Sequence, residues 1–63
     1  MTELEKLYQN MADTLEQGMT DLEKFEAGNM SAGTRVRKTM QSVKNLAQAI
    51  RVEVQEQKNT VAA

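Results

Sequence analysis

The stretch that decides how this chain folds is Gly28-Asn29-Met30-Ser31-Ala32-Gly33-Thr34-Arg35-Val36-Arg37-Lys38, because it joins two helix-forming halves of opposite charge. The first 28 residues hold seven acids against two lysines, a net charge of −5. The remaining residues hold six cations against two acids, a net charge of +4. The overall charge of −1 therefore conceals a strongly polarised chain.

Composition limits both the size of the fold and its chemistry. Sixty-three residues make one small domain, near the lower limit for a self-sufficient core. The sequence has no cysteine and no histidine, so disulfides, thiolate metal sites and the usual general base are all excluded. We therefore expect no enzyme activity, no metal, no cofactor and no small-molecule substrate.

No apolar run approaches the roughly 20 residues of a membrane span, and the acidic N-terminus is unlike a signal peptide. These features predict a cytoplasmic protein.

The first half predicts a helix over about residues 2–27. Good helix formers dominate, and Thr2 followed by Glu5 fits a capping box, in which each side chain accepts a bond from the other residue's backbone N–H. Gly28 is suited to end the helix because glycine tolerates the left-handed conformation found there. Apolar residues recur at alternating steps of four and three, which is typical of a coiled-coil seam. The seam residues are Leu4, Tyr8, Met11, Leu15, Gly18, Leu22 and Phe25.

The second half predicts a helix over about residues 32–58, after a turn at about 28–31, and the residues assigned to the turn are Gly28, Asn29 and Gly33. Asn29 or Ser31 can cap this helix with its side-chain oxygen. The last residues, 59–63, are expected to fray. An alternating series again forms a seam, and it consists of Gly33, Val36, Met40, Val43, Ala47, Ile50, Val54, Gln57 and Val61.

Two seamed helices joined by a short turn predict an all-α fold, an antiparallel two-helix hairpin that spans residues 1–63 as one domain. A hairpin covers only one stripe of each helix. Apolar residues beside the seams would stay partly exposed, and this favours a homodimer that forms a four-helix bundle. These flanking residues are Leu7, Met19, Leu46 and Val52.

A basic row follows the second helix. Arg37, Lys44, Arg51 and Lys58 recur at a spacing of seven, which places them along one edge of the seam. Such a row suits the phosphates of a nucleic-acid backbone. The alternative is that the row pairs with acids of the first helix across the seam. The acids on or near that edge are Glu5, Glu16, Glu23 and Glu26.

The centre of the chain also resembles a known family. Gly28-Asn29, Ala32 and Arg35-Val36-Arg37, continued by residues 46–51, are similar to the N-terminal region of the chlamydial histone-like proteins and their short bacterial relatives. The resemblance covers roughly residues 20–57. It implies chromatin-like binding and compaction of DNA without strong sequence preference. Members of that family carry a Lys-rich tail, so we expect this chain to correspond to the helical region without that tail.

These observations predict a small, dimeric, histone-like protein of the nucleoid that contacts the DNA backbone electrostatically. Few aromatic side chains are present for stacking on bases, so we expect phosphate contacts with little sequence preference. The alternative hypothesis is a structural or adaptor coiled coil whose ligand is another protein. The candidate nucleic-acid-binding residues are Arg35, Arg37, Lys38, Lys44 and Arg51.

Overall fold

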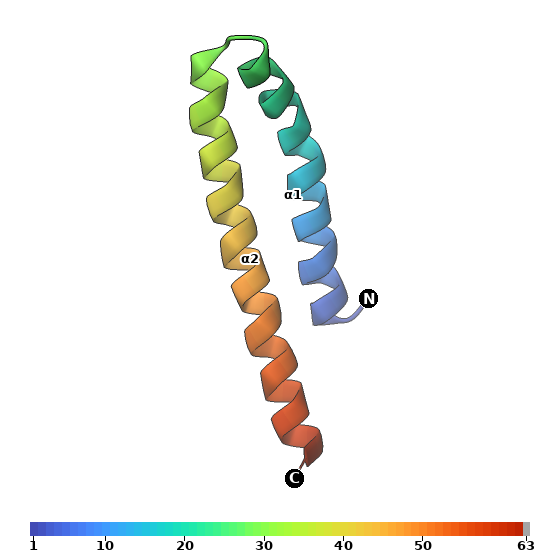
Figure 1. The fold of residues 1–63 in the computed structure, drawn as a ribbon. Helices are drawn as coiled ribbons and strands as arrows, with labels where there is room; N and C mark the ends of the chain where they lie inside the picture. The colour runs from blue at the N-terminus through green and yellow to red at the C-terminus, as the bar shows by residue number, and fades with distance from the viewer. Residues whose placement is uncertain (63) are drawn as a thin grey trace.

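The computed structural model is an antiparallel pair of helices (Figure 1). Helix α1 spans Glu3–Glu26, and helix α2 spans Met30–Ala62. The structure describes the backbone of residues 1–62 and side chains as far as residue 60. Within that range there is no strand, and the two helices pack against each other. The prediction of an all-α helical hairpin is confirmed.

The start of α1 is a complete capping box. The Thr2 hydroxyl oxygen accepts a 3.1 Å bond from the Glu5 backbone N–H, and the Glu5 carboxylate accepts a 2.9 Å bond from the Thr2 backbone N–H. Both backbone donors are thereby satisfied at an exposed helix end. The bonds to Thr2, that of its backbone N–H first, lower the pKa of the Glu5 carboxyl.

The turn between the helices is a Schellman motif centred on Gly28. This glycine has a φ of 106°, in the left-handed region that favours glycine. Its N–H donates to the Phe25 carbonyl, and the Asn29 N–H donates to the Lys24 carbonyl, each at 3.0 Å. These are the two bonds that define the motif, and they satisfy carbonyls left free at the end of α1. The chain consequently reverses direction in three residues.

Helix α2 begins earlier and ends later than residues 32–58. Asn29 caps it, because its side-chain oxygen and its carbonyl accept bonds of 3.3 and 3.2 Å from the Ala32 N–H. No glycine or proline follows Gly33, so nothing in the sequence ends the helix near residue 58. Within the segment expected to fray, the Thr60 hydroxyl donates to the Glu56 carbonyl at 3.0 Å. Residue 63 lies outside the described residues.

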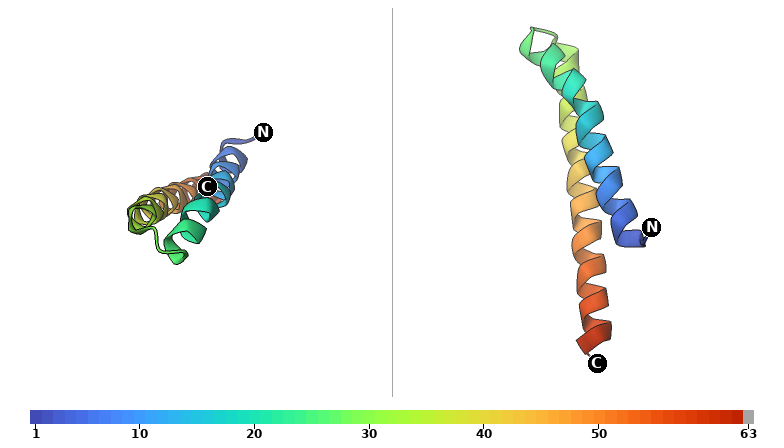
Figure 2. Two further views of the ribbon diagram at one scale, coloured as in Figure 1. Left: turned by 90° about the horizontal axis from the view of Figure 1, so that it is seen from above. Right: turned by 90° about the vertical axis from the view of Figure 1, so that its right-hand side faces the viewer.

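The molecule is long and narrow, with extents of 54 × 19 × 11 Å. Helix α2 continues well past the N-terminus of α1, as Figures 1 and 2 both show. Among the described side chains only Ala32 is fully buried. The remaining contact between the helices comes from half-buried residues, which on α1 are Leu4, Leu7, Met11, Thr14, Gly18 and Asp21 and on α2 are Gly33, Val36, Thr39, Val43, Leu46, Ala47, Ile50 and Glu53.

The predicted seam residues divide into two groups. Eight are half-buried between the helices, namely Leu4, Met11, Gly18, Gly33, Val36, Val43, Ala47 and Ile50, and the side chain of Val61 lies outside the described residues. The others are exposed, because the line of contact is rotated towards Leu7 on α1 and Leu46 on α2. The exposed fractions of the apolar ones are Tyr8 65%, Leu15 46%, Leu22 40%, Phe25 41%, Met40 47% and Val54 40%.

Two glycines allow the helices to approach closely. A Cβ at Gly18 would lie 3.0 Å from the Thr39 Cγ2 atom, and a Cβ at Gly33 would lie 2.7 Å from the Phe25 ring. Both distances are shorter than ordinary carbon contacts. The small residues therefore determine which faces meet, and the wider apolar stripe remains at one side of the contact.

Candidate nucleic-acid interface

The candidate cations all belong to α2, whose first turns follow the Schellman turn directly. Arg35 is the one candidate cation that makes an ion pair among the described residues. Its Nε donates a 2.8 Å bond to Asp21 Oδ1 on α1. The Arg35 side chain is 48% exposed and the Asp21 side chain 23%. An arginine has five N–H donors, so this contact occupies one donor and leaves the exposed end of the guanidinium accessible.

The other four candidates are exposed and make no ion pair among the described residues. Pairing of the basic row with Glu5, Glu16, Glu23 and Glu26 within one hairpin is therefore not formed. The acid that does pair, Asp21, lies on the inner face and was absent from that set. The row of Arg37, Lys44 and Arg51 consequently keeps its charge on the surface of a single hairpin.

Polar side chains accompany these cations on the outward side of α2. Thr34 and Gln41 line a shallow hollow with Arg37 and Lys38. Successive residues three and four apart lie on one side of a helix, so this group forms a strip that faces away from α1. Hydroxyl and amide groups beside cations are common donors to phosphate oxygens.

A second hollow continues the strip towards the middle of α2. It is lined by Lys44, Asn45, Ala47, Gln48 and Arg51. The Gln41 side-chain amide donates a 3.2 Å bond to the Asn45 side chain, which links the two hollows. Sequence reasoning identified the cations and missed these polar neighbours. Their positions one turn from each cation are the signal that could have found them.

Between residues 1 and 62, no group of three or more acidic side chains is placed to hold a metal ion. The same range contains no helix that is both long enough and apolar enough to cross a membrane. What the site offers is a strip of cations and hydrogen-bond donors along one exposed helix.

A comparison with protein families decides the class. The family described as histone H1-like protein Hc1 matches residues 5–60, which cover nearly all of both helices and the whole strip. The chain belongs to the histone H1-like protein Hc1 family. This confirms the resemblance to chlamydial histone-like proteins. Neither curated proteins nor solved structures gave a significant match.

Membership in the Hc1 family makes the chain a histone-like, DNA-binding protein. The family is one of DNA-packaging proteins and not of enzymes. It also implies association with the nucleoid. The match covers the helical hairpin itself, so the relevant surface is to be sought on these two helices.

Proposed function

We propose that this Hc1-family protein binds the DNA backbone electrostatically, with little sequence preference, through the outward side of α2. Arg37 and Lys38 make the first contacts, because they lie between Thr34 and Gln41 on the first turns of the helix. Lys44 and Arg51 extend the contact, and the accessible end of the Arg35 guanidinium adds to it at the tip. No base-reading element is required for this mode of binding.

The observation that carries this proposal is the charge imbalance along α2. Between Thr34 and Val52 the helix holds five cations and no acid. Only Arg35 among the five makes an ion pair in the described residues. A strip of uncompensated charge on an exposed helix releases counterions from DNA when it binds, which is the main source of sequence-independent affinity.

The test is a titration of duplex DNA against salt with two matched variants. R37Q/K38Q removes two cations from the strip, whereas K6Q/K24Q removes two cations from α1. Each phosphate contact contributes about 0.9 to the slope of log affinity against log salt. We expect the first variant to lower that slope by about 1.8 and the second to leave it unchanged. Equal effects of both variants would overturn the proposal.

We further propose that the functional unit is a homodimer. A compact folded protein of 7.1 kDa exposes about 4,100 Å², whereas this hairpin exposes 5045 Å². The excess, about 900 Å², is close to the roughly 800 Å² that each partner buries in a stable complex. Sedimentation across a concentration series tests this proposal, and a monomer at tens of micromolar would refute it.

The adaptor hypothesis draws on the same exposed apolar residues, which could contact a different protein. A variant that separates the two hypotheses is R35Q/R37Q/K38Q. Loss of DNA binding with an intact dimer supports the histone-like function. Unchanged DNA binding together with loss of another protein partner supports the adaptor.

A further inference from the structure

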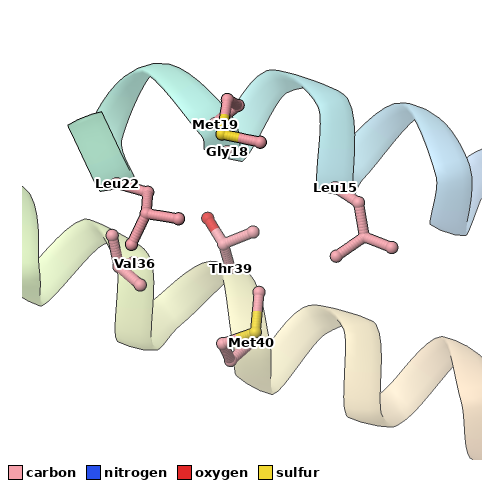
Figure 3. Close-up of a pocket in the computed structure, with 7 residues that line it drawn as sticks. All are labelled: Leu15, Gly18, Met19, Leu22, Val36, Thr39 and Met40. Atoms are coloured by element: carbon pink, nitrogen blue, oxygen red, sulfur yellow. The ribbon is translucent and has the colours of Figure 1, made fainter.

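One side of the hairpin carries an apolar face that has no partner within the chain. Leu15, Met19 and Leu22 of α1 and Val36 and Met40 of α2 line a shallow pocket there, and Figure 3 shows their side chains around the gap between the helices. Only Val36 of these five is half-buried. This is the surface that a second copy would cover in the homodimer proposed above.

The edge of this face on α1 is acidic. Met19 lies three residues after Glu16 and four before Glu23, so both acids adjoin it on the side away from Leu15 and Leu22. Glu5 precedes Glu16 by eleven residues, about three helical turns, and belongs to the same edge. All three acids are exposed and make no ion pair in the described part of the chain.

The edge of this face on α2 is basic, and its charges have the same spacing as the acids on α1. Met40 lies three residues after Arg37 and four before Lys44, so these cations adjoin it just as Glu16 and Glu23 adjoin Met19. Arg51 continues the edge seven residues further on. The apolar face is therefore bounded by negative charge along one helix and positive charge along the other.

Two symmetric arrangements bring two such faces together. If the two-fold axis runs parallel to the helices, α1 packs opposite the partner's α2 and both turns lie at the same end. If the axis runs across the helices, α1 packs opposite the partner's α1 and the turns lie at opposite ends. The second arrangement places acidic edge on acidic edge and basic edge on basic edge, which is repulsive.

We propose that the two hairpins pair with their turns at the same end, the acidic edge of each α1 against the basic edge of the partner's α2. The proposal rests on the homodimer described under the proposed function. The apolar faces supply the affinity, and the charged edges select the arrangement.

The levels of the charges along the helices agree with this arrangement. Gly18 lies beside Thr39, and Phe25 lies beside Gly33, within one hairpin. These contacts determine which residues of α1 and α2 lie at the same level along the helix axes. A two-fold axis parallel to the helices leaves those levels unchanged in the second copy. By this register each acid lies within about three residues, or roughly 5 Å, of a cation. The pairs across the interface are Glu5 with the partner's Arg51, Glu16 with the partner's Lys44 and Glu23 with the partner's Arg37.

The arrangement has a direct consequence for DNA. The first turns of both α2 helices, with Arg35, Arg37 and Lys38 of each copy, lie at one end of the dimer. Lys38, Thr34 and Gln41 face outward from α2, so the paired edges leave them free to contact phosphates. In this dimer Arg37 adjoins the partner's Glu23, so the cations left for phosphates at this end are Lys38 and the accessible end of Arg35 from each copy.

The first experiment measures the distance between the two turns. The chain has no cysteine, so S31C can carry a single nitroxide label on the exposed first turn of α2, and pulsed EPR reads the distance in the dimer. Turns at the same end give about 15–25 Å, from helix spacings of 8–10 Å and the label linkers. Turns at opposite ends give roughly 36 Å or more, the length of the 24-residue α1.

The outcomes separate the two proposals. A dimer with the longer distance overturns the arrangement and leaves the homodimer intact. A chain that stays monomeric overturns the homodimer and the arrangement with it. Both outcomes leave the expected slope change of about 1.8 for R37Q/K38Q in place, whereas the paired Arg37 of the same-end dimer lowers that change towards about 0.9.

Charge reversal supplies the second experiment, at low salt to limit screening. E16K/E23K places like charges at both edges, and we expect the dimer dissociation constant to rise about tenfold. R37E/K44E should raise the dissociation constant by a similar factor. The quadruple variant E16K/E23K/R37E/K44E should recover the original value. In the opposite arrangement E16K/E23K keeps like charge against like charge, so an unchanged dissociation constant would overturn the proposal.

Discussion

The Nε of Arg35 donates to Asp21 Oδ1 at 2.8 Å, and this is the single ion pair between α1 and α2 in residues 1–62. Asp21 is the less exposed partner and lies on the inner face of α1. The contact fixes the start of α2 against the end of α1, and it keeps one cation of the tip partly neutralised. Stability and DNA binding therefore make opposite demands on Asp21.

Asp21→Asn and Arg35→Gln should have effects of the same sign on stability and of opposite sign on DNA binding. Each loses the ion pair, which costs about 1 kcal/mol or less for an exposed pair. D21N removes a negative charge and releases Arg35, so its affinity for duplex DNA should rise, whereas R35Q should lower it. Thermal melts and salt titrations measure both quantities. A fall in affinity for both variants would contradict this account.

Gly28→Ala should destabilise the hairpin through the backbone alone. Nothing lies within 4 Å of a Cβ at this position, yet its φ is 106°, a conformation that costs an L-residue about 1–2 kcal/mol. Gly28→Asn is the matched control, because asparagine tolerates the left-handed region better. Denaturant melts should rank wild type above G28N and G28N above G28A. Equal stability of all three would show that the Schellman turn is not maintained in solution.

Gly18→Ala should show a strong dependence on Thr39. Alanine is the better helix former by about 0.5–1 kcal/mol, but its Cβ would meet the Thr39 methyl group at 3.0 Å. Thr39→Ser removes that methyl group. We expect G18A to stabilise the T39S background by nearly the full helix-forming gain and the wild type by less. A double-mutant cycle of melts measures the difference, and additive effects would mean that the helices are not in close contact here.

The capping box predicts an acid-sensitive start of α1. The pKa of Glu5 is lowered, chiefly by the Thr2 backbone N–H and then by its side chain. The stabilisation is complete above the ordinary glutamate pKa of about 4.3, and it is lost as the pH falls through the lowered pKa of the folded state. NMR titration of the Glu5 carboxyl measures this value. Thr2→Ala should raise the pKa only in part, because the backbone donor remains.

Thr2→Ala also removes the hydroxyl that caps the Glu5 N–H. Substitution of such a cap costs about 0.5–2 kcal/mol. Thr2→Ser, which keeps the hydroxyl, is the control and should melt close to the wild type. A full return of the Glu5 pKa to its ordinary value in T2A would show that the backbone bond is not formed.

The sequence predicts the helices and the turn well, because those features depend on local interactions. Thr2 with Glu5, and Gly28 after the first helix, act within one or two turns of the chain. The rotation of the helices about their axes was not predictable in the same way. The predicted seams include Gly18 and Gly33, which do lie on the contact, but they also include apolar residues such as Leu15 and Met40, which are exposed. Hydropathy alone does not tell which side of a wide apolar stripe faces the other helix.

Polar residues on the contact line show the same limit. Four polar residues are half-buried there, namely Thr14, Asp21, Thr39 and Glu53. A search for alternating apolar residues does not identify such positions. For the site, the spacing of seven predicts one row of cations along α2. It could not show that Asp21 would pair with Arg35, because that contact depends on the rotation of α1.

The near absence of buried side chains has a thermodynamic consequence. With Ala32 alone fully buried among the described side chains, a single hairpin has little apolar burial to offset the entropy of ordering its chain. If the hairpin pairs as proposed, folding, pairing and attachment to DNA become linked equilibria, in which each step stabilises the others by mass action. DNA that gathers many copies along its length would raise their local concentration and so promote the folding of the proteins it recruits.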